Sequence, residues 1–278
     1  MTRLKPNDIE AISAQLAHYN NELLQKTGHT LRGIACHALG VNEQEILPRL
    51  RNVTVGIIPI LSGQGIIPGF SETISHIVRH IGLNAFITSG TDVAGIAEAV
   101  EKGAQVIMMA DDQRFVALNV IHGIIIDNAE ATGKGFVAGL DLMSGGLKGQ
   151  KVLIIGCGPV GLSAVLSAIH WGAEISLFDI DSQRSQELAK TINERTGLHV
   201  AIEQTLEQAF GSSRLFVEAT NAAGIIDESV ITDETYIVAP GMPLGLTPAA
   251  VRKVSGRLLH DPLQLGVAVM AIETAMSI

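Results

Sequence analysis

The chain has 278 residues, 47% of them hydrophobic, which is enough to bury one large core or two ordinary ones. Its formal net charge of −9 argues against a nucleic-acid partner, because phosphate binding needs clustered Lys and Arg, and the sequence has no such cluster. A small, positively charged partner is compatible with this balance. The amino-terminal residues are too polar for a signal peptide, and the apolar runs fall far short of the roughly 20 residues of a bilayer span. We therefore expect a cytoplasmic protein that does not associate with membranes.

The first half of the chain begins with an apolar helical stripe. Pro6 stands where a first helical residue would be, and an amino-terminal helix over about 7–25 is indicated by Ile9, Ile12, Leu16, Tyr19 and Leu23. This helix is either ordinary packing or a mobile lid over a pocket. From residue 53 onward strand and helix patterns alternate. The sequence predicts strands over 53–60, 85–88 and 105–109 and helices over 70–81 and 91–102, the second with an inner face of Val93, Ile96, Ala97 and Val100.

Residues 113–143 have a helical pattern without proline, interrupted by Gly123 and by Gly133–Gly135. We interpret them as two helices that pass from one domain to the next. The predicted fold is α/β with two domains. A smaller amino-terminal α/β domain for the substrate, with its leading helix, covers 1–126. A Rossmann-type domain with a doubly wound parallel sheet, including a linking helix and a carboxyl-terminal helix, covers 127–278.

A candidate substrate pocket follows the predicted strands of the first domain. Ser62 lies in a glycine-punctuated loop after one strand, Phe70 lies near the start of the next helix, and Asp111 follows the apolar strand that ends in Met109. Ligands of open α/β sheets bind beyond the carboxyl ends of the strands. We therefore expect Ser62, Phe70 and Asp111 to line one pocket, in which Asp111 binds a substrate ammonium and orients the reacting carbon.

The second domain opens with a G-x-G-x-x-G motif that follows a strand and starts a helix. Gly156 permits the tight turn, Gly158 lets a pyrophosphate approach the backbone, and Gly161 lets the helix pack closely, while Pro159 and Val160 begin that helix. Asp179 ends the next strand at about the 20-residue spacing of a ribose-binding acid. Its carboxylate would accept from a 2′-hydroxyl and repel a 2′-phosphate. NAD is therefore favoured over NADP, although Arg184 nearby keeps NADP open.

Later strand ends supply further candidate contacts to the cofactor. Strands over 214–218 and 236–239 are followed by Thr220 and Asn221 and by Pro240 and Gly241, which we expect to flank the dinucleotide. Asn128 could hold the carboxamide or the substrate, or could simply cap a helix.

Other chemistries find little support in the sequence. His76 and His80 are spaced i, i+4, but no third ligand accompanies them, so no metal site is predicted. No nucleophile elbow or Ser-His-Asp arrangement stands out. Cys36 and Cys157 fit no disulfide framework, and Cys157 inside the glycine turn is interpreted as a space-filling residue rather than a nucleophile.

Several segments resemble one known family. The segments 57–72 (IIPILSGQGIIPGFSE), 86–100 (FITSGTDVAGIAEAV) and 103–115 (GAQVIMMADDQRF), with the glycine motif and the late APGMP at 239–243, are similar to the pyrrolysine biosynthesis family PylD. The resemblance runs essentially end to end. It implies NAD-dependent oxidation of the terminal amine carbon of 3-methylornithyl-N6-lysine, loss of ammonia to give a semialdehyde, and ring closure to pyrrolysine.

The resemblance also implies a set of substrate-binding residues: Leu4, Ile60, Ser62, Phe70 and Asp111, with Asp261 a weaker candidate. The segment 41–52 is longer than this family implies and is interpreted as a surface elaboration. The partner we expect is a small cationic dipeptide-like substrate, and the chain itself is expected to form a homo-oligomer, a dimer. Two other functions remain open: another amino-acid or folate-type NAD(P) dehydrogenase, and a non-catalytic NAD-sensing module, against which the lack of a basic DNA-binding arm argues.

Overall fold

A computed structural model describes residues 4–278, and their contacts divide the chain into two compact units. Unit 1 runs to Gln25, continues over His29–Thr132 and ends with Pro262–Ile278. Unit 2 comprises Lys26–Gly28 and Gly133–Asp261. The expected architecture of two α/β domains, the later one of Rossmann type, is confirmed.

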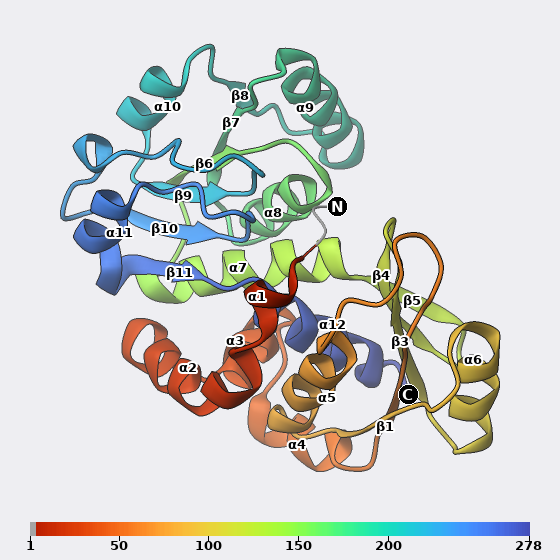
Figure 1. Cartoon of the computed structure of the whole chain (residues 1–278). Coiled ribbons are helices and arrows are strands. Elements are labelled where there is room, and N and C mark those ends of the chain that lie inside the picture. Colours follow the sequence, from red (N-terminus) through yellow and green to blue (C-terminus); the bar gives the residue numbers. More distant parts are fainter. Residues whose placement is uncertain (1–3) are drawn as a thin grey trace. The chain divides into compact units, whose positions relative to one another are not determined.

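Unit 1 contains a mixed five-stranded sheet with the order β2-β1-β3-β4-β5 (Figure 1). β1 pairs in parallel with β2 and β3, whereas β4 and β5 are antiparallel additions. Its strands are β1 (Thr54–Ile58), β2 (Asn84–Ile87), β3 (Val106–Ala110), β4 (Phe115–Asn119) and β5 (Ile124–Asp127). Its helices are α1 (Pro6–Ile9), α2 (Ile12–Thr27), α3 (Leu31–Ala38), α4 (Glu43–Leu50), α5 (Phe70–His80), α6 (Asp92–Glu101) and α12 (Gln264–Met276).

Unit 2 contains a fully parallel six-stranded sheet with the order β11-β10-β9-β6-β7-β8. Counted along the chain from β6, this is the doubly wound order 6-5-4-1-2-3, with its topological switch point between β6 and β9. Its strands are β6 (Lys151–Ile155), β7 (Glu174–Phe178), β8 (Ala201–Ile202), β9 (Leu215–Glu218), β10 (Tyr236–Ala239) and β11 (Leu258–His260). The surrounding elements are α8 (Pro159–His170), α9 (Ser182–Thr196), α10 (Leu206–Ser212), η1 (Glu228–Val230), α11 (Pro248–Val254) and η2 (Ser255–Arg257).

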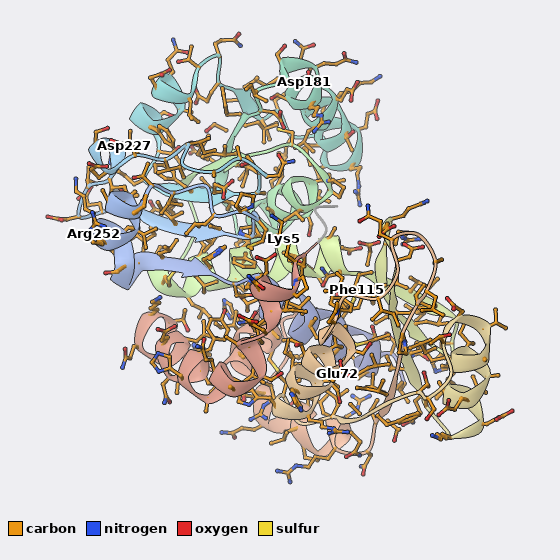
Figure 2. All side chains as sticks on the ribbon, in the orientation of Figure 1. Lys5, Glu72, Phe115, Asp181, Asp227 and Arg252 are labelled. Carbon is orange, nitrogen blue, oxygen red and sulfur yellow. The ribbon has the colours of Figure 1, made fainter. Side chains whose placement is uncertain are left out.

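The helical interpretation of residues 113–143 is wrong for its first part. The structure forms the β4–β5 hairpin there, and Gly123 turns with φ +68°, a conformation that favours glycine. Phe115, labelled in Figure 2, is buried and alternates with half-buried residues because every second residue of β4 faces the core. Only α7 (Asn128–Ser144) is helical, and the division between the units falls within it.

The predicted inner face of α6 is wrong except at Ile96, which packs against a core cluster of unit 1. Val93 is 79% and Val100 49% exposed, whereas Gly95 and Ala99 are buried. The small residues face the sheet because the helix comes very close to it: a Cβ on Gly56 of β1 would lie 2.8 Å from the Ala99 Cβ.

Two further expectations differ from the contact pattern. The carboxyl-terminal helix α12 was placed in the second domain, but it packs on α3, α5, β4 and β5 of unit 1 and is buried along nearly its whole length. The segment 41–52 is no mere surface elaboration, because α4 within it buries Ile46 and Leu50 and contacts α3 and α12. In the described part of the chain, no helix is long and apolar enough to span a bilayer.

Candidate functional site

The glycine turn of unit 2 connects β6 to α8 and leaves room for a ligand against its backbone. Gly156 has φ +98°, and a Cβ there would lie 2.7 Å from the Ala219 carbonyl oxygen. A Cβ on Gly161 would collide with the Gly156 carbonyl, so α8 starts directly against the turn. At Gly158, however, nothing lies within 4 Å of the Cβ position. This open cradle fits the close backbone approach that a pyrophosphate requires.

The amino end of α8 adds unpaired backbone donors to the cradle. Pro159 occupies the first turn, Val160 follows it, and among residues 4–278 no side chain caps this end of the helix. The first-turn amides of a helix carry partial positive charge and attract anions. The arrangement therefore suits a phosphate group.

Asp179 follows β7, which pairs in parallel with β6. Its Oδ2 accepts a hydrogen bond from the Cys157 amide at 2.8 Å, and its Oδ1 accepts from the Asp181 amide at 3.0 Å. A carboxylate has about four acceptor positions, so capacity for a ribose hydroxyl remains. Arg184 is the residue whose charge left binding of a 2′-phosphate as an alternative. Its Nε lies 3.6 Å from the Oδ2 of Asp181, which caps α9 and is labelled in Figure 2.

The opposite side of the switch point is built on a residue that the sequence analysis missed. Glu218 ends β9 and is 0% exposed, and it lies between the loop with Thr220 and Asn221 and the loop with Pro240 and Gly241. Burial raises the pKa of its carboxyl above the ordinary value, while hydrogen bonds from Thr220 and Gly245 oppose the rise. The one available signal was an acidic residue at the end of an otherwise apolar strand.

Cys157 within the turn has the environment of a packed thiol. Burial raises its pKa to about 11, and its Sγ lies 3.7 Å from the Ser185 Oγ. A thiol that stays protonated at neutral pH is a poor nucleophile. These features support the space-filling interpretation.

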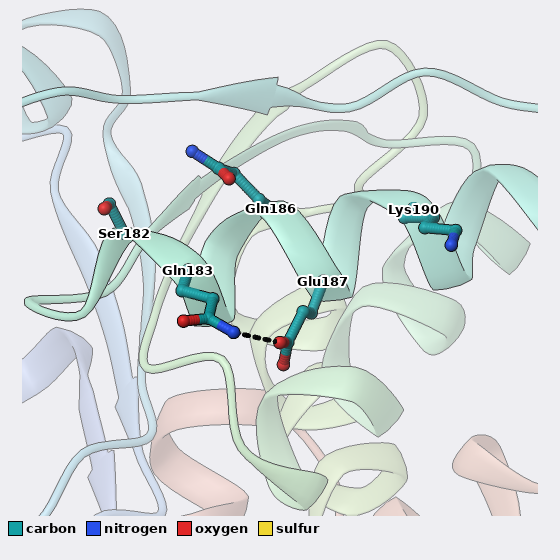
Figure 3. Close-up of a pocket in the computed structure, with 5 residues that line it drawn as sticks. All are labelled: Ser182, Gln183, Gln186, Glu187 and Lys190. Carbon is teal, nitrogen blue, oxygen red and sulfur yellow. Dashed lines mark hydrogen bonds between the residues drawn. The ribbon is translucent and has the colours of Figure 1, made fainter.

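A depression of about 500 Å³ on α9 contains none of the predicted site residues. It is lined by Ser182, Gln183, Gln186, Glu187 and Lys190 (Figure 3). Gln183 Nε2 donates to Glu187 Oε1 at 2.8 Å, so the polar groups of this helix partly satisfy each other. We assign the depression no role, because one exposed helix alone forms it.

In unit 1, two aspartates hold the loop that follows β1. The Asp92 Oδ1 accepts from the Leu61 amide at 3.0 Å, and the Asp112 Oδ2 accepts from the Gln64 amide at 2.6 Å. Thr91 precedes α6 at the capping position, but its side chain makes no capping bond. Asp92 adopts φ +52°, a conformation that costs energy for a residue with a Cβ. The loop that carries Ile60 and Ser62 is thus fixed from the start of α6 and from the turn after β3.

Asp111 lies beside this loop, after β3. Its Oδ1 accepts from the amides of Gln113 and Arg114, both at 2.8 Å, and these bonds lower the pKa of the carboxyl. Asp111 is therefore ionised at neutral pH and well exposed. Its Oδ2 has no hydrogen-bond partner among residues 4–278, so one oxygen remains available to a ligand.

The remaining predicted substrate residues are placed as follows. Phe70 begins α5 and packs edge to face on Phe115, with ring centroids 5.5 Å apart. Leu4 is half-buried just before α1, and α1 packs on α5. Leu4, Ile60, Ser62, Phe70 and Asp111 therefore all belong to unit 1, whereas the buried Asp261 ends unit 2. Asn128, expected to hold the carboxamide or substrate, starts α7 in unit 1, and its buried Oδ1 has no partner in the described part of the chain.

The fold and the glycine turn define a two-domain protein of the Rossmann dehydrogenase type. Residues 8–126 match the family model of pyrrolysine biosynthesis protein PylD, N-terminal domain, and residues 124–236 match alanine dehydrogenase/PNT, C-terminal domain. The solved structure of quinate dehydrogenase from Corynebacterium glutamicum in complex with NAD has a TM-score of 0.55 at 18% identity, covering 81% of this chain and 94% of that chain. This likeness concerns the fold alone.

Curated relatives resemble the chain over nearly its whole length. The pyrrolysine synthases of Methanosarcina acetivorans and Methanosarcina barkeri are 32% and 30% identical over 272 residues, which cover 97% of this chain and 98% and 97% of theirs. The chain belongs to the PylD family of pyrrolysine synthases.

Proposed function

We propose that the chain is an NAD-dependent dehydrogenase that converts 3-methylornithyl-N6-lysine to pyrrolysine. The single observation that carries the proposal is the open glycine cradle with Asp179 beside it, in a chain similar to two pyrrolysine synthases over 97% of its length. The cradle supports a dinucleotide, and the family supports the substrate.

The residues of unit 2 provide contacts for each part of the cofactor. Gly158, Pro159 and Val160 would bind the pyrophosphate, and Asp179 would accept from the adenosine ribose. Thr220, Asn221, Pro240 and Gly241 would flank the remaining half. When bound, NAD supplies an acceptor for the hydride of a carbon that bears an amine.

The proposed reaction balances as an oxidation followed by two exchanges with water. The terminal amine carbon of the methylornithine part gives up a hydride and its nitrogen loses a proton, which leaves an imine. Water then adds and ammonia leaves, which gives the semialdehyde. The α-amine of the same residue condenses with that aldehyde and releases water, and the product is the pyrroline ring.

Asp111 is the residue that we propose to orient the substrate. A substrate with several ammonium groups requires carboxylates, and Asp111 offers an ionised side chain with a free oxygen at the carboxyl edge of the sheet. A charge-assisted hydrogen bond to an ammonium would hold the reacting carbon in one position. Asp92 and Asp112 support the site indirectly by fixing the loop with Ile60 and Ser62.

Incubation with NAD and synthetic 3-methylornithyl-N6-lysine, followed by mass spectrometry, tests the proposal. We expect pyrrolysine and NADH in equal amounts. A parallel incubation with alanine and NAD tests the alternative of another amino-acid dehydrogenase. The match of residues 124–236 to alanine dehydrogenase/PNT, C-terminal domain, is the reason to test it. NADH formation from alanine alone would replace our proposal with that alternative.

The homodimer stays a prediction that light scattering checks.

A further inference from the structure

We infer that Glu218 is a positioning residue that joins the two loops of the proposed cofactor site, and that its buried negative charge makes this site favour NAD⁺ over NADH. The inference rests on the proposed function for the presence of the nicotinamide cofactor. It adds a residue and a selectivity that the cradle and Asp179 do not account for.

The Glu218 carboxylate binds donors from both loops. Its Oε1 accepts from the Thr220 amide at 2.8 Å and from the Thr220 Oγ1 at 2.5 Å, while its Oε2 accepts from the Gly245 amide at 3.2 Å. The main-chain oxygen of Glu218 also accepts from the Gly241 amide at 3.1 Å. A single side chain therefore connects the loop after β9 to the loop after β10.

Two glycines allow the second loop to pack on this carboxylate. A Cβ on Gly241 would lie 2.8 Å from the Glu218 Oε2, and a Cβ on Gly245 would lie 2.5 Å from its Cδ. Neither glycine has a positive φ, so close approach rather than backbone conformation requires them. The loop around 240–245 is shaped to fit one buried acid.

The hydrogen-bond pattern favours the ionised form of Glu218. Its three donors, two of them backbone amides that can only donate, stabilise the ionised form and oppose the effect of burial. No basic side chain of residues 4–278 lies within ion-pair distance of it. The charge is thus balanced by dipoles alone, and its field extends into the surrounding low-dielectric region.

An unpaired anion at this edge distinguishes the two redox forms of the cofactor. The nicotinamide ring is cationic in NAD⁺ and neutral in NADH, so a nearby negative charge stabilises the oxidised form. Glu218 lies at the carboxyl end of β9, next to the switch point where a dinucleotide binds in doubly wound sheets. Such a preference favours loading of the oxidised cofactor and release of the reduced one, whereas hydride transfer to the bound cofactor becomes less favourable.

Dissociation constants of NAD⁺ and NADH, measured by titration without substrate, test the inference. In Glu218→Gln we expect the ratio of the NADH to the NAD⁺ dissociation constant to fall roughly tenfold. Glu218→Asp keeps the charge but shortens the reach, so both affinities should weaken together with the ratio nearly unchanged. Glu174→Gln, an equal charge change at the exposed amino end of β7, should leave both constants unaltered.

The outcomes separate this inference from the proposed function. If wild-type protein binds both dinucleotides and Glu218→Gln leaves their ratio unchanged, the selectivity is overturned while the proposed function stands. If wild-type protein binds neither, both are overturned.

Hydrogen exchange of the protein without cofactor tests the positioning role even if Glu218→Gln does not fold. Thr220→Val removes the hydroxyl that donates to Glu218 and accepts from the Ala222 amide of its own loop. We expect exchange at the Gly245 amide, in the other loop, to accelerate severalfold. Unchanged exchange at Gly245 would show that Glu218 does not join the loops.

Discussion

The Asp179 carboxylate accepts a hydrogen bond from the Cys157 amide at 2.8 Å, so the proposed ribose-binding acid and the glycine turn hold each other in place. We predict that the protein binds NAD more tightly than NADP, because a 2′-phosphate would be repelled by this carboxylate. Asp179→Ala or Asp179→Ser should narrow the difference by on the order of 1 to 3 kcal/mol. Isothermal titration of the wild-type and variant proteins with NAD and with NADP measures this difference in binding free energy. Equal or better affinity of wild-type protein for NADP would contradict the prediction, and Glu194→Gln at the far end of α9 is the control.

Asp111→Asn should lower kcat/KM while the affinity for the cofactor stays the same. The fall in kcat/KM should correspond to a loss of about 2 to 5 kcal/mol of transition-state stabilisation. Asn keeps the Oδ1 that accepts from Gln113 and Arg114, so the turn should survive and only the charge is lost. Steady-state kinetics on 3-methylornithyl-N6-lysine measures the effect.

The control for Asp111→Asn must remove one negative charge without disturbing the loop that follows β1. The neighbouring Asp112 cannot serve, because its bond to the Gln64 amide holds the loop that follows β1, so Asp112→Asn is expected to disturb activity as well. Glu101→Gln at the end of α6 removes the same charge from an exposed position. Near-normal kcat/KM in Asp111→Asn would refute the proposed role.

The amino-terminal segment is predicted to close over the substrate through Leu4. Deleting everything up to Gln25 is too coarse a test, because Ile9, Ile12, Leu16 and Leu23 are buried and each loss costs about 2 to 5 kcal/mol. Leu4→Ala should instead lower turnover severalfold while thermal stability and NAD affinity stay the same. Lys5→Ala, exposed and adjacent, serves as control. If Leu4→Ala turns over normally, the segment only packs.

Gly133→Ala should destabilise the protein by about 1 to 3 kcal/mol, since the added Cβ would lie 2.5 Å from the Ser163 Cβ of α8. Gly211→Ala in α10 is the matched control. It has nothing within 4 Å of the Cβ position and no positive φ, so alanine there should add about 0.5 to 1 kcal/mol of stability. Chemical denaturation of both variants measures the difference, and equal stabilities would show that α7 can move away from α8.

Both thiols should resist modification at pH 8 in the folded protein, because burial raises the pKa of Cys36 and of Cys157 from 9.0 to about 11. Between these values the unfolded chain loses protons that the folded protein retains, so the free energy of unfolding should fall as pH rises from about 9 to about 11. A thiol reagent and denaturation at several pH values check the two statements. Rapid reaction of either thiol without denaturant would contradict the first.

Local patterns predicted the parts of the molecule that depend on neighbouring residues. The glycine turn and Asp179 follow from spacing within one βαβ unit: α8 begins at Pro159 as predicted, and β7 ends at Phe178, directly before Asp179. The β4–β5 hairpin was missed because Asn119 and the apolar run at 124–126 obscure the alternation of buried residues. Glu218 was missed because its partner Gly245 is 27 residues away in sequence. Asp111 and Asp112 are neighbours of one chemical type, and only the backbone path shows which of them holds the loop.

The packing of α12 on α3, α5, β4 and β5 determines when unit 1 can finish folding during synthesis. Unit 1 is interrupted in sequence by Gly133–Asp261, so its core is completed only after Pro262–Ile278 has left the ribosome. Until then α3 and α5 expose the apolar surface that α12 will cover. The Rossmann unit, whose main segment is continuous, can fold earlier. Unit 1 then still exposes apolar surface that chaperones can bind.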